Sequence, residues 1–293
     1  MRQSNIELLR ISAMMLVLIV HAAFFTFGWP TPDTIQQSPL EQTLMTVAEA
    51  MAIICVNVFV LISGWFGIRP TVKSLSKFLF QVFFFLFGIY AVMLIIGKAQ
   101  FSIKGLLECC TITNWNWFIK AYLALYLISP VLNAFVEKAD RRTFKWVLIS
   151  FFVLQTVYGW AVGTPNYASG YSTLSFIGLY LLARYFKIYR PKFTLHNKGF
   201  YLGVYFLCVA FLVALTIIPG LYMKGGYASV LISRLYNYVC PIVIVEACAY
   251  FFVFERFTPP VKCGYCQSIR RLGWICQLGR GIKLCSVPAP YQS

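Results

Sequence analysis

The chain is 293 residues long, 60% of its residues are hydrophobic, 12% are charged, and its net charge is +16. A soluble chain of ordinary composition has roughly twice that charged share, about 25%, and a domain of this size cannot bury so much apolar surface. Together with the lack of a glycine repeat, these values exclude a soluble domain, a collagen and a disordered chain, and they indicate an integral membrane protein.

Apolar stretches follow one another along the chain, each close to the ~20 residues that a membrane-crossing helix needs. Their apolar character is continuous rather than alternating, which favours helices over a β-barrel. We therefore predict an all-α fold, a polytopic transmembrane helix bundle with about eight spans. The spans are expected at 6–28, 44–66, 77–97, 117–136, 145–163, 171–187, 200–219 and 235–255.

Lys and Arg are distributed unevenly over the segments that separate these stretches. With the N-terminus in the cytoplasm, twenty of them fall in cytoplasmic segments and five in segments on the other side. This asymmetry fits the positive-inside rule with an even number of spans, and it explains the net charge without a nucleic acid partner. We expect a multi-pass protein of the inner, or plasma, membrane whose N-terminus is cytoplasmic.

Apolar character stops after Arg256, which divides the chain into a membrane domain, 1–256, and a tail, 257–293. The tail is basic and contains four cysteines, of which Cys263 and Cys266 form one close pair. A zinc site needs a second close pair, which the spacing of the other two does not supply, so no metal is expected. We interpret the tail as a disordered basic segment or as the product of a shifted reading frame.

His21 lies inside the first apolar stretch, 6–28. An ionisable side chain costs about 2.5–3.5 kcal/mol to insert into a bilayer, so it marks a candidate functional residue. A neutral imidazole can take up and return a proton near neutral pH. The sequence therefore indicates His21 as a general base, with a hydrogen bond to a neighbouring helix as the simpler alternative.

Arg10 lies eleven residues before His21, which on a helix is three turns plus about 20°. The two side chains therefore share a helix face and lie roughly 16 Å apart along the axis. A guanidinium near the cytoplasmic surface suits an anionic donor such as a phosphorylated cofactor. The alternative is that Arg10 only anchors the helix at the membrane surface.

Three segments resemble the acyltransferase-3 family of bacterial membrane enzymes. Asn5–Met14, with His21 eleven residues after Arg10, is similar to the start of that family and to its Arg-x10-His element. Phe59–Phe66 resembles its Ile-Ser-Gly signature in the second span, and Trp115–Asn133 resembles the block around its fourth span. The resemblance covers 1–256, whereas the family usually has about ten spans, so the last pair is absent here.

The resemblance implies a membrane-bound O-acyltransferase. Such an enzyme transfers an acyl group, most often acetyl, from acetyl-CoA to a hydroxyl of a cell-surface or lipid-linked polysaccharide. Arg10 would lie near the phosphates or the thioester of the donor. His21 would act as the general base on the acceptor hydroxyl or carry the acyl group briefly. The expected partners are the glycan acceptor and the lipid bilayer, and no nucleic acid.

Further polar and aromatic residues are candidates for supporting roles. Glu49 and Glu246 are expected to face the bundle interior, where each would orient His21, bind a hydroxyl, or form a helix-to-helix hydrogen bond. Trp115 and Trp117 fall near the predicted outer surface, where aromatic belts are common, and they are also suited to stack on a sugar ring. Lys120 lies beside them and is a candidate contact for an anionic glycan.

Two other functions are consistent with the sequence. A polytopic transporter or flippase for a glycan or a small solute would also use buried His and Glu side chains, but the two similar halves typical of many transporters are not seen. A truncated, inactive product is the third interpretation, and it predicts poor accumulation in membranes.

Overall fold

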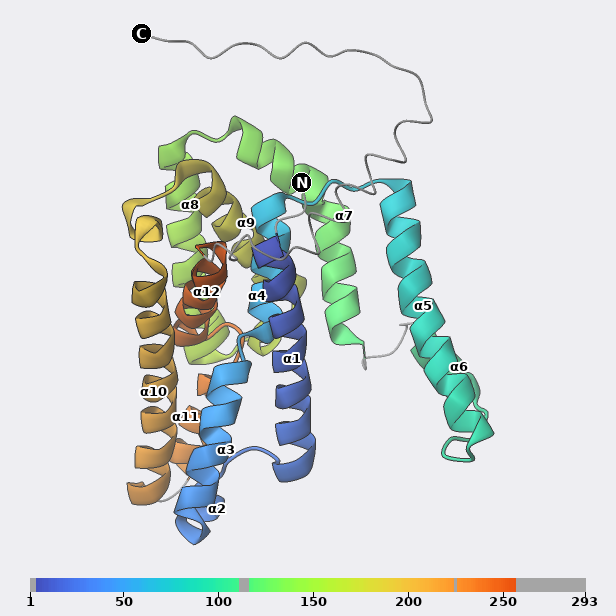
Figure 1. Cartoon of the computed structure of the whole chain (residues 1–293), viewed down its shortest axis with the longest axis vertical. Coiled ribbons are helices and arrows are strands. Elements are labelled where there is room, and N and C mark those ends of the chain that lie inside the picture. Colours follow the sequence, from blue (N-terminus) through green and yellow to red (C-terminus); the bar gives the residue numbers. More distant parts are fainter. Residues whose placement is uncertain (1–3, 111–115, 224–225, 257–293) are drawn as a thin grey trace, which may run out of the picture. The chain divides into compact units, whose positions relative to one another are not determined.

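The computed structural model describes residues 4–110, 116–223 and 226–256 (Figure 1). The regular elements in these residues are all helices, which confirms the predicted all-α bundle. In chain order they are α1 (Ser4–Phe27), α2 (Pro32–Gln37), α3 (Pro39–Ala52), α4 (Cys55–Phe66), α5 (Val72–Ile95), α6 (Ile103–Cys109), α7 (Trp117–Lys138), α8 (Arg141–Leu154), the π-helical η1 (Gln155–Val162), the short η2 (Ala168–Gly170), α9 (Thr173–Tyr189), η3 (Lys192–Leu195), α10 (Lys198–Tyr222), α11 (Gly226–Leu235) and α12 (Pro241–Glu255). The predicted tail, 257–293, lies outside the described residues.

Several helices begin at side chains that bind the first free backbone N–H groups. The Thr71 hydroxyl accepts a hydrogen bond at the start of α5, the Asp140 carboxylate does so at α8, and the Ser172 hydroxyl at α9. Such caps satisfy donors that have no partner within the helix. They set where each helix starts after a loop.

Within the described residues, six helical stretches are long and apolar enough to cross a membrane. They are Ser4–Ala23, Pro39–Phe66, Val72–Ile95, Trp117–Lys138, Arg141–Val162 and Lys198–Tyr222. The prediction of about eight spans also counted the regions of α9 and α12, which have 17 and 15 residues. At 1.5 Å per residue these helices are about 26 and 22 Å long, shorter than the ~30 Å hydrocarbon core. The α9 helix has the same length as its predicted span, whereas α12 is shorter than its predicted span because residues 236–240 are non-helical.

The α4 helix forms the centre of the bundle. It contacts α1, α9 and α12, and most of its side chains are buried. A Cβ atom on Gly64 would lie 2.5 Å from the carbonyl oxygen of Tyr180, so glycine is what permits α4 and α9 to pack this closely. A helix that is apolar all round is expected in such a central position.

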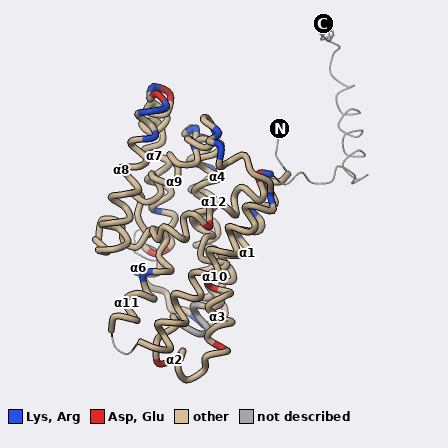
Figure 2. The backbone as a smooth tube through the Cα atoms, turned by 90° about the vertical axis from the view of Figure 1, so that its left-hand side faces the viewer, with Lys and Arg blue, Asp and Glu red and all other residues tan. Residues whose placement is uncertain are grey.

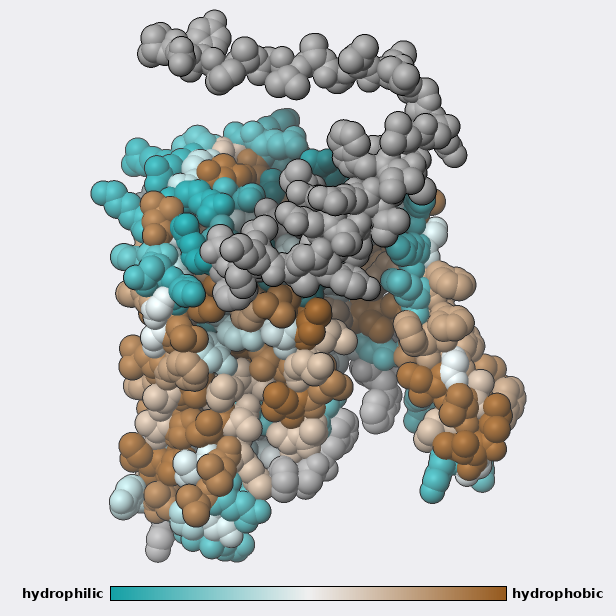
Figure 3. Space-filling model, in the orientation of Figure 1, coloured by the Kyte–Doolittle hydropathy of each residue, from teal (hydrophilic) through white to brown (hydrophobic). Residues whose placement is uncertain are grey.

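The α5 helix is the opposite case, because none of its residues is buried. Its exposed side chains include Phe80, Phe84 and Phe85. Figure 3 shows hydrophobic residues over the middle of the visible face and hydrophilic residues toward its ends. An apolar surface of this extent is typical of a protein in contact with lipid. Together with the six long apolar helical stretches, it identifies a membrane protein.

Basic residues of the described chain gather mainly at one end of the bundle (Figure 2). This end, called the basic end below, is where α1 begins and where α7 meets α8. Arg141 and Arg142 open α8 there, and Arg190 follows α9, where it pairs with Glu255 at 2.8 Å. The charge asymmetry inferred along the sequence is thus also an asymmetry in space.

Candidate active site

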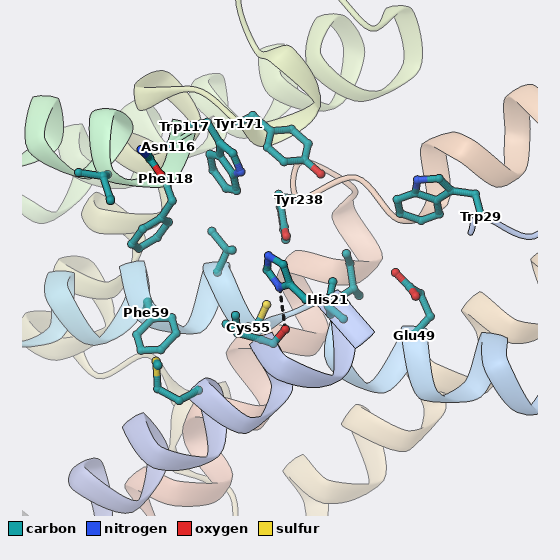
Figure 4. A pocket seen from close by; sticks show the side chains of 16 residues that line it. His21, Trp29, Glu49, Cys55, Phe59, Asn116, Trp117, Phe118, Tyr171 and Tyr238 are labelled. Atoms are coloured by element: carbon teal, nitrogen blue, oxygen red, sulfur yellow. Dashed lines mark hydrogen bonds between the residues drawn. The ribbon is translucent and has the colours of Figure 1, made fainter. Parts of the chain in front are cut away.

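A cavity of about 610 Å³ lies within the bundle and is lined by residues from α1, α3, α4 and α7 and from the segments that precede α9 and α12 (Figure 4). Ile53 and Ile54 separate the α3 helix from the α4 helix. The cavity lies at this break, since Ile53 and Cys55 both line it. Irregular backbone at membrane depth is tolerated where it is buried in protein or lines a cavity. The break between α3 and α4 therefore forms part of the cavity wall.

The α1 helix contributes one stripe of side chains to the cavity wall. Met14, Val17 and His21 are spaced three and four residues apart and all line the cavity. Arg10 precedes Met14 by four residues and so continues this stripe by one turn, but it does not line the cavity. Its guanidinium instead binds the Glu7 carboxylate at 2.8 Å and lies 5.8 Å from the centre of the Phe66 ring.

The His21 ring is oriented by its own helix. Nδ1 lies 2.8 Å from the carbonyl oxygen of Val17. Because a carbonyl oxygen only accepts hydrogen bonds, Nδ1 carries the hydrogen, and in the neutral ring Nε2 is then the basic nitrogen. Figure 4 shows His21 in the middle of the cavity wall. The arrangement suits a group that removes a proton from a molecule bound in the cavity.

Among the described residues, Glu49 is the acidic one in the cavity wall. Its side chain comes from α3, and only 6% of the residue is exposed. Its Oε1 atom has no hydrogen bond partner among the described residues. Figure 4 shows the carboxyl group pointing into the space between His21 and Trp29. A buried carboxyl oxygen without a partner is costly, so this atom is suited to accept a hydrogen bond from a bound molecule.

Three aromatic rings form another part of the wall. The Trp117 ring centre lies 4.4 Å from that of Tyr171 and 5.8 Å from that of Tyr238, and the last two lie 5.2 Å apart. Trp117 opens α7, whereas Tyr171 and Tyr238 belong to the non-helical segments before α9 and α12. The shortness of these two helices thus brings their preceding aromatic residues into the cavity wall.

Two contacts hold the segment of Tyr238 in place. The buried Asn57 of α4 donates a hydrogen bond of 3.0 Å from Nδ2 to the carbonyl oxygen of Tyr238. Gly170 has a φ of +97°, and a Cβ atom there would lie 2.4 Å from the Cβ of Tyr238. Glycine is required at this position by both the backbone angle and the close approach. These contacts fix one wall of the cavity.

Glu246 does not line this cavity. It lies on α12 with 0% of its surface exposed, and neither carboxyl oxygen has a hydrogen bond partner among the described residues. It lies close enough to Tyr205 and Tyr236 for electrostatic interaction. The expectation that Glu246 faces the bundle interior agrees with this position, but the structure does not bring it to the cavity wall with His21.

The other predicted site residues fall in different places. Trp117 lines the cavity, and Lys120, one turn further along α7, does not. Trp115 lies outside the described residues. Sequence reasoning missed Trp29, Asn116, Tyr171 and Tyr238, which also line the cavity. They belong to loops and helix starts without periodicity, so no spacing pattern identified them.

Comparison with known families matches residues 3–257 to a family described as an acyltransferase domain. The match spans the described bundle and includes His21, Glu49 and Trp117. No curated protein and no solved structure matches the chain. The family match favours an acyltransferase over the transporter that the sequence also permitted.

Proposed function

Because the chain belongs to the acyltransferase-3 family, we propose that it transfers an acyl group, acetyl in the first instance, from acetyl-CoA to a hydroxyl of a cell-surface or lipid-linked polysaccharide. The observation that carries this proposal is the position of His21, an ionisable side chain in a membrane helix that lines a cavity together with Glu49 and Trp117. A cavity of about 610 Å³ is within the ordinary size of a small-molecule site.

In this proposal the basic end of the bundle faces the cytoplasm of the cell and the protein resides in the inner, or plasma, membrane. The positive-inside rule supports this orientation. Acetyl-CoA then approaches from the basic end, and Arg10 meets its phosphates or its thioester. Arg10 is suited to this role because a guanidinium presents several donors to phosphate oxygens.

The transfer proceeds in one displacement. Nε2 of His21 takes the proton of the acceptor hydroxyl while the hydroxyl oxygen forms a bond to the carbonyl carbon of the thioester. The bond between this carbon and the sulfur of CoA then breaks. The proton passes from His21 to the departing thiolate, so the products are the acylated sugar and CoA with a free thiol.

The test is transfer of labelled acetyl from acetyl-CoA to glycan in membranes that contain the chain. The His21→Ala variant is expected to lose at least about 100-fold in rate, because general base catalysis contributes typically 10²–10⁴-fold. The matched control is His196→Ala, since His196 lies outside the cavity and packs on Phe200 with ring centres 4.3 Å apart.

The control is expected to retain the rate of the unaltered protein. Equal rates for the unaltered protein and the His21→Ala variant would contradict the role of His21. No transfer by the unaltered protein, when it is present in the membrane, would contradict the proposed function itself.

A further inference from the structure

The cavity differs in character on the two sides of His21. Figure 4 shows Phe59 and Phe118 on one side and Trp29 and Glu49 on the other. The first side is mainly apolar, although Asn116 lies beside Phe118, and it continues along α1 through Met14 toward the basic end. The second side has a carboxyl group and an indole. A chemically divided cavity of this kind is suited to hold two different reactants, one on each side of a central base.

The unpartnered oxygen of Glu49 indicates what the second side binds. Only 6% of this residue is exposed, and its Oε1 atom finds no donor among the described residues. Buried polar atoms are almost always hydrogen-bonded, so a donor is expected to come from a bound molecule. Hydroxyl and amino groups of a sugar are such donors.

Trp29 supplies a flat apolar surface next to this carboxyl group. Its ring centre lies 5.9 Å from that of Tyr236, which is buried, and 39% of Trp29 is exposed. Contact with Tyr236 supports the indole from one side. An indole face can pack against the C–H face of a pyranose ring, while a neighbouring carboxyl group accepts hydrogen bonds from the hydroxyls at the ring edge.

The charge of the wall limits what this side accepts. His21 and Glu49 are the only His, Lys, Arg, Asp or Glu residues among the described residues that line the cavity. A carboxylate bound beside Glu49 would lie next to a second carboxyl group in a largely apolar surrounding, where the two cannot both be ionised, and the described residues of the wall supply no guanidinium or ammonium group to compensate the charge. A neutral or amino sugar brings no second carboxyl group to this side.

We propose that the Trp29 and Glu49 side of the cavity is the acceptor subsite, that it takes an uncharged or amino pyranose, and that Glu49 excludes uronic acids. The inference rests on the proposed function for the identity of the reaction. Glu49 is a binding and specificity residue here, and the acyl thioester occupies the apolar side formed by Phe59 and Phe118. The acceptor hydroxyl then lies between Glu49 and His21.

The first test compares pairs of probes that differ only in charge. Phenyl β-glucoside and phenyl β-galactoside are offered beside the corresponding phenyl uronides, and transfer of labelled acetyl is measured. The unaltered protein is expected to favour the neutral member of a pair by at least about 10-fold. Glu49→Gln is expected to raise the KM for the neutral sugar several-fold. It is also expected to bring the ratio of transfer to the neutral sugar over transfer to the uronide close to one.

The matched control is Glu41→Gln. Glu41 lies on the same helix, α3, but it is exposed and does not line the cavity. This variant is expected to keep both the KM and the preference. A Glu49→Gln variant with an unchanged KM and an unchanged preference would overturn the inference, while the loss of transfer in His21→Ala would still support the proposed function.

The second test measures binding without turnover. Saturation-transfer NMR detects methyl glycosides that bind to the His21→Ala variant in micelles of a detergent that contains no sugar. Methyl glucoside or methyl galactoside is expected to receive saturation, and the uronides are not. The signal is expected to fall in His21→Ala combined with Glu49→Gln, and also with Trp29→Leu.

The control for the indole is Trp146→Leu, because Trp146 is 58% exposed on α8 and lies outside the cavity. Equal binding of uronides and neutral sugars, or equal binding after Trp29→Leu, would overturn the inference. Because this test needs no acyl transfer, its outcome is independent of the proposed reaction.

Discussion

Glu49 and Glu246 are the same residue type in two regions of one bundle. Both are buried, with exposed fractions of 6% and 0%, and both have carboxyl oxygens without a partner among the described residues. Glu49 lies on α3 just before the helix break and lines the cavity, whereas Glu246 lies within α12 and does not. Burial is therefore common to both carboxyl groups, and what distinguishes Glu49 is its position beside irregular backbone and a cavity.

Among the variants that test this comparison, the largest effect is expected when Glu49 is replaced by an apolar side chain of similar size, with the same change at Glu246 as its counterpart. Glu49→Leu is expected to lower acetyl transfer about 10- to 100-fold, because hydrogen bonds from the acceptor are lost. Glu246→Leu is expected to leave transfer within about twofold and to raise the free energy of unfolding by about 1 kcal/mol, because an unpartnered carboxyl group is removed from an apolar site. The measurements are the transfer rate in membranes and thermal denaturation in detergent.

Equal losses of transfer in the two variants would contradict the conclusion that Glu49 acts in the cavity and Glu246 does not. A large loss in Glu246→Leu with unchanged stability would return Glu246 to the supporting role that the sequence first indicated for it.

A second prediction extends the comparison to the donor side. Arg10→Ala is expected to raise the KM for acetyl-CoA about 10-fold, because a charge-assisted hydrogen bond to the donor is lost, and to leave the KM for the acceptor sugar unchanged. Arg142→Ala is the matched control, since Arg142 is an exposed guanidinium at the basic end. If Arg10→Ala changed the KM for the acceptor sugar and not the KM for acetyl-CoA, the assignment of Arg10 to the donor would be contradicted.

The smallest effect is expected at the wall that holds Tyr238. Asn57→Ala removes the hydrogen bond to the carbonyl oxygen of Tyr238, and we expect a loss of about 1–3 kcal/mol in the free energy of unfolding with a several-fold decrease in transfer. Asn197→Ala is the control, because Asn197 accepts a hydrogen bond at the exposed start of α10. If Asn57→Ala lowered stability but left transfer unchanged, the segment of Tyr238 would not be part of the working site.

The fold class followed from composition and from the continuous apolar stretches, but the number of spans did not. Continuous apolar stretches predicted helices, and the described residues are helical. Hydropathy does not distinguish a helix that fills the centre from one that faces lipid, so α4 and α5 look alike in sequence although one is largely buried and the other has no buried residue. It also did not reveal that α12 is short, because residues 236–240, which lie in the predicted span 235–255, adopt non-helical backbone.

The sequence by itself determined that this is a helical membrane protein of the acyltransferase-3 family, and it indicated His21 as the principal candidate for the general base. These conclusions depend on composition, on spacing along one helix and on three short segments that resemble the family, all of which can be read along the chain. Only the tertiary structure decided that Glu49 joins His21 in the cavity while Glu246 does not, and that Trp29, Tyr171 and Tyr238 complete the wall. The reason is physical: these residues come from loops and from helices distant in sequence, and only the packing of the bundle brings them together.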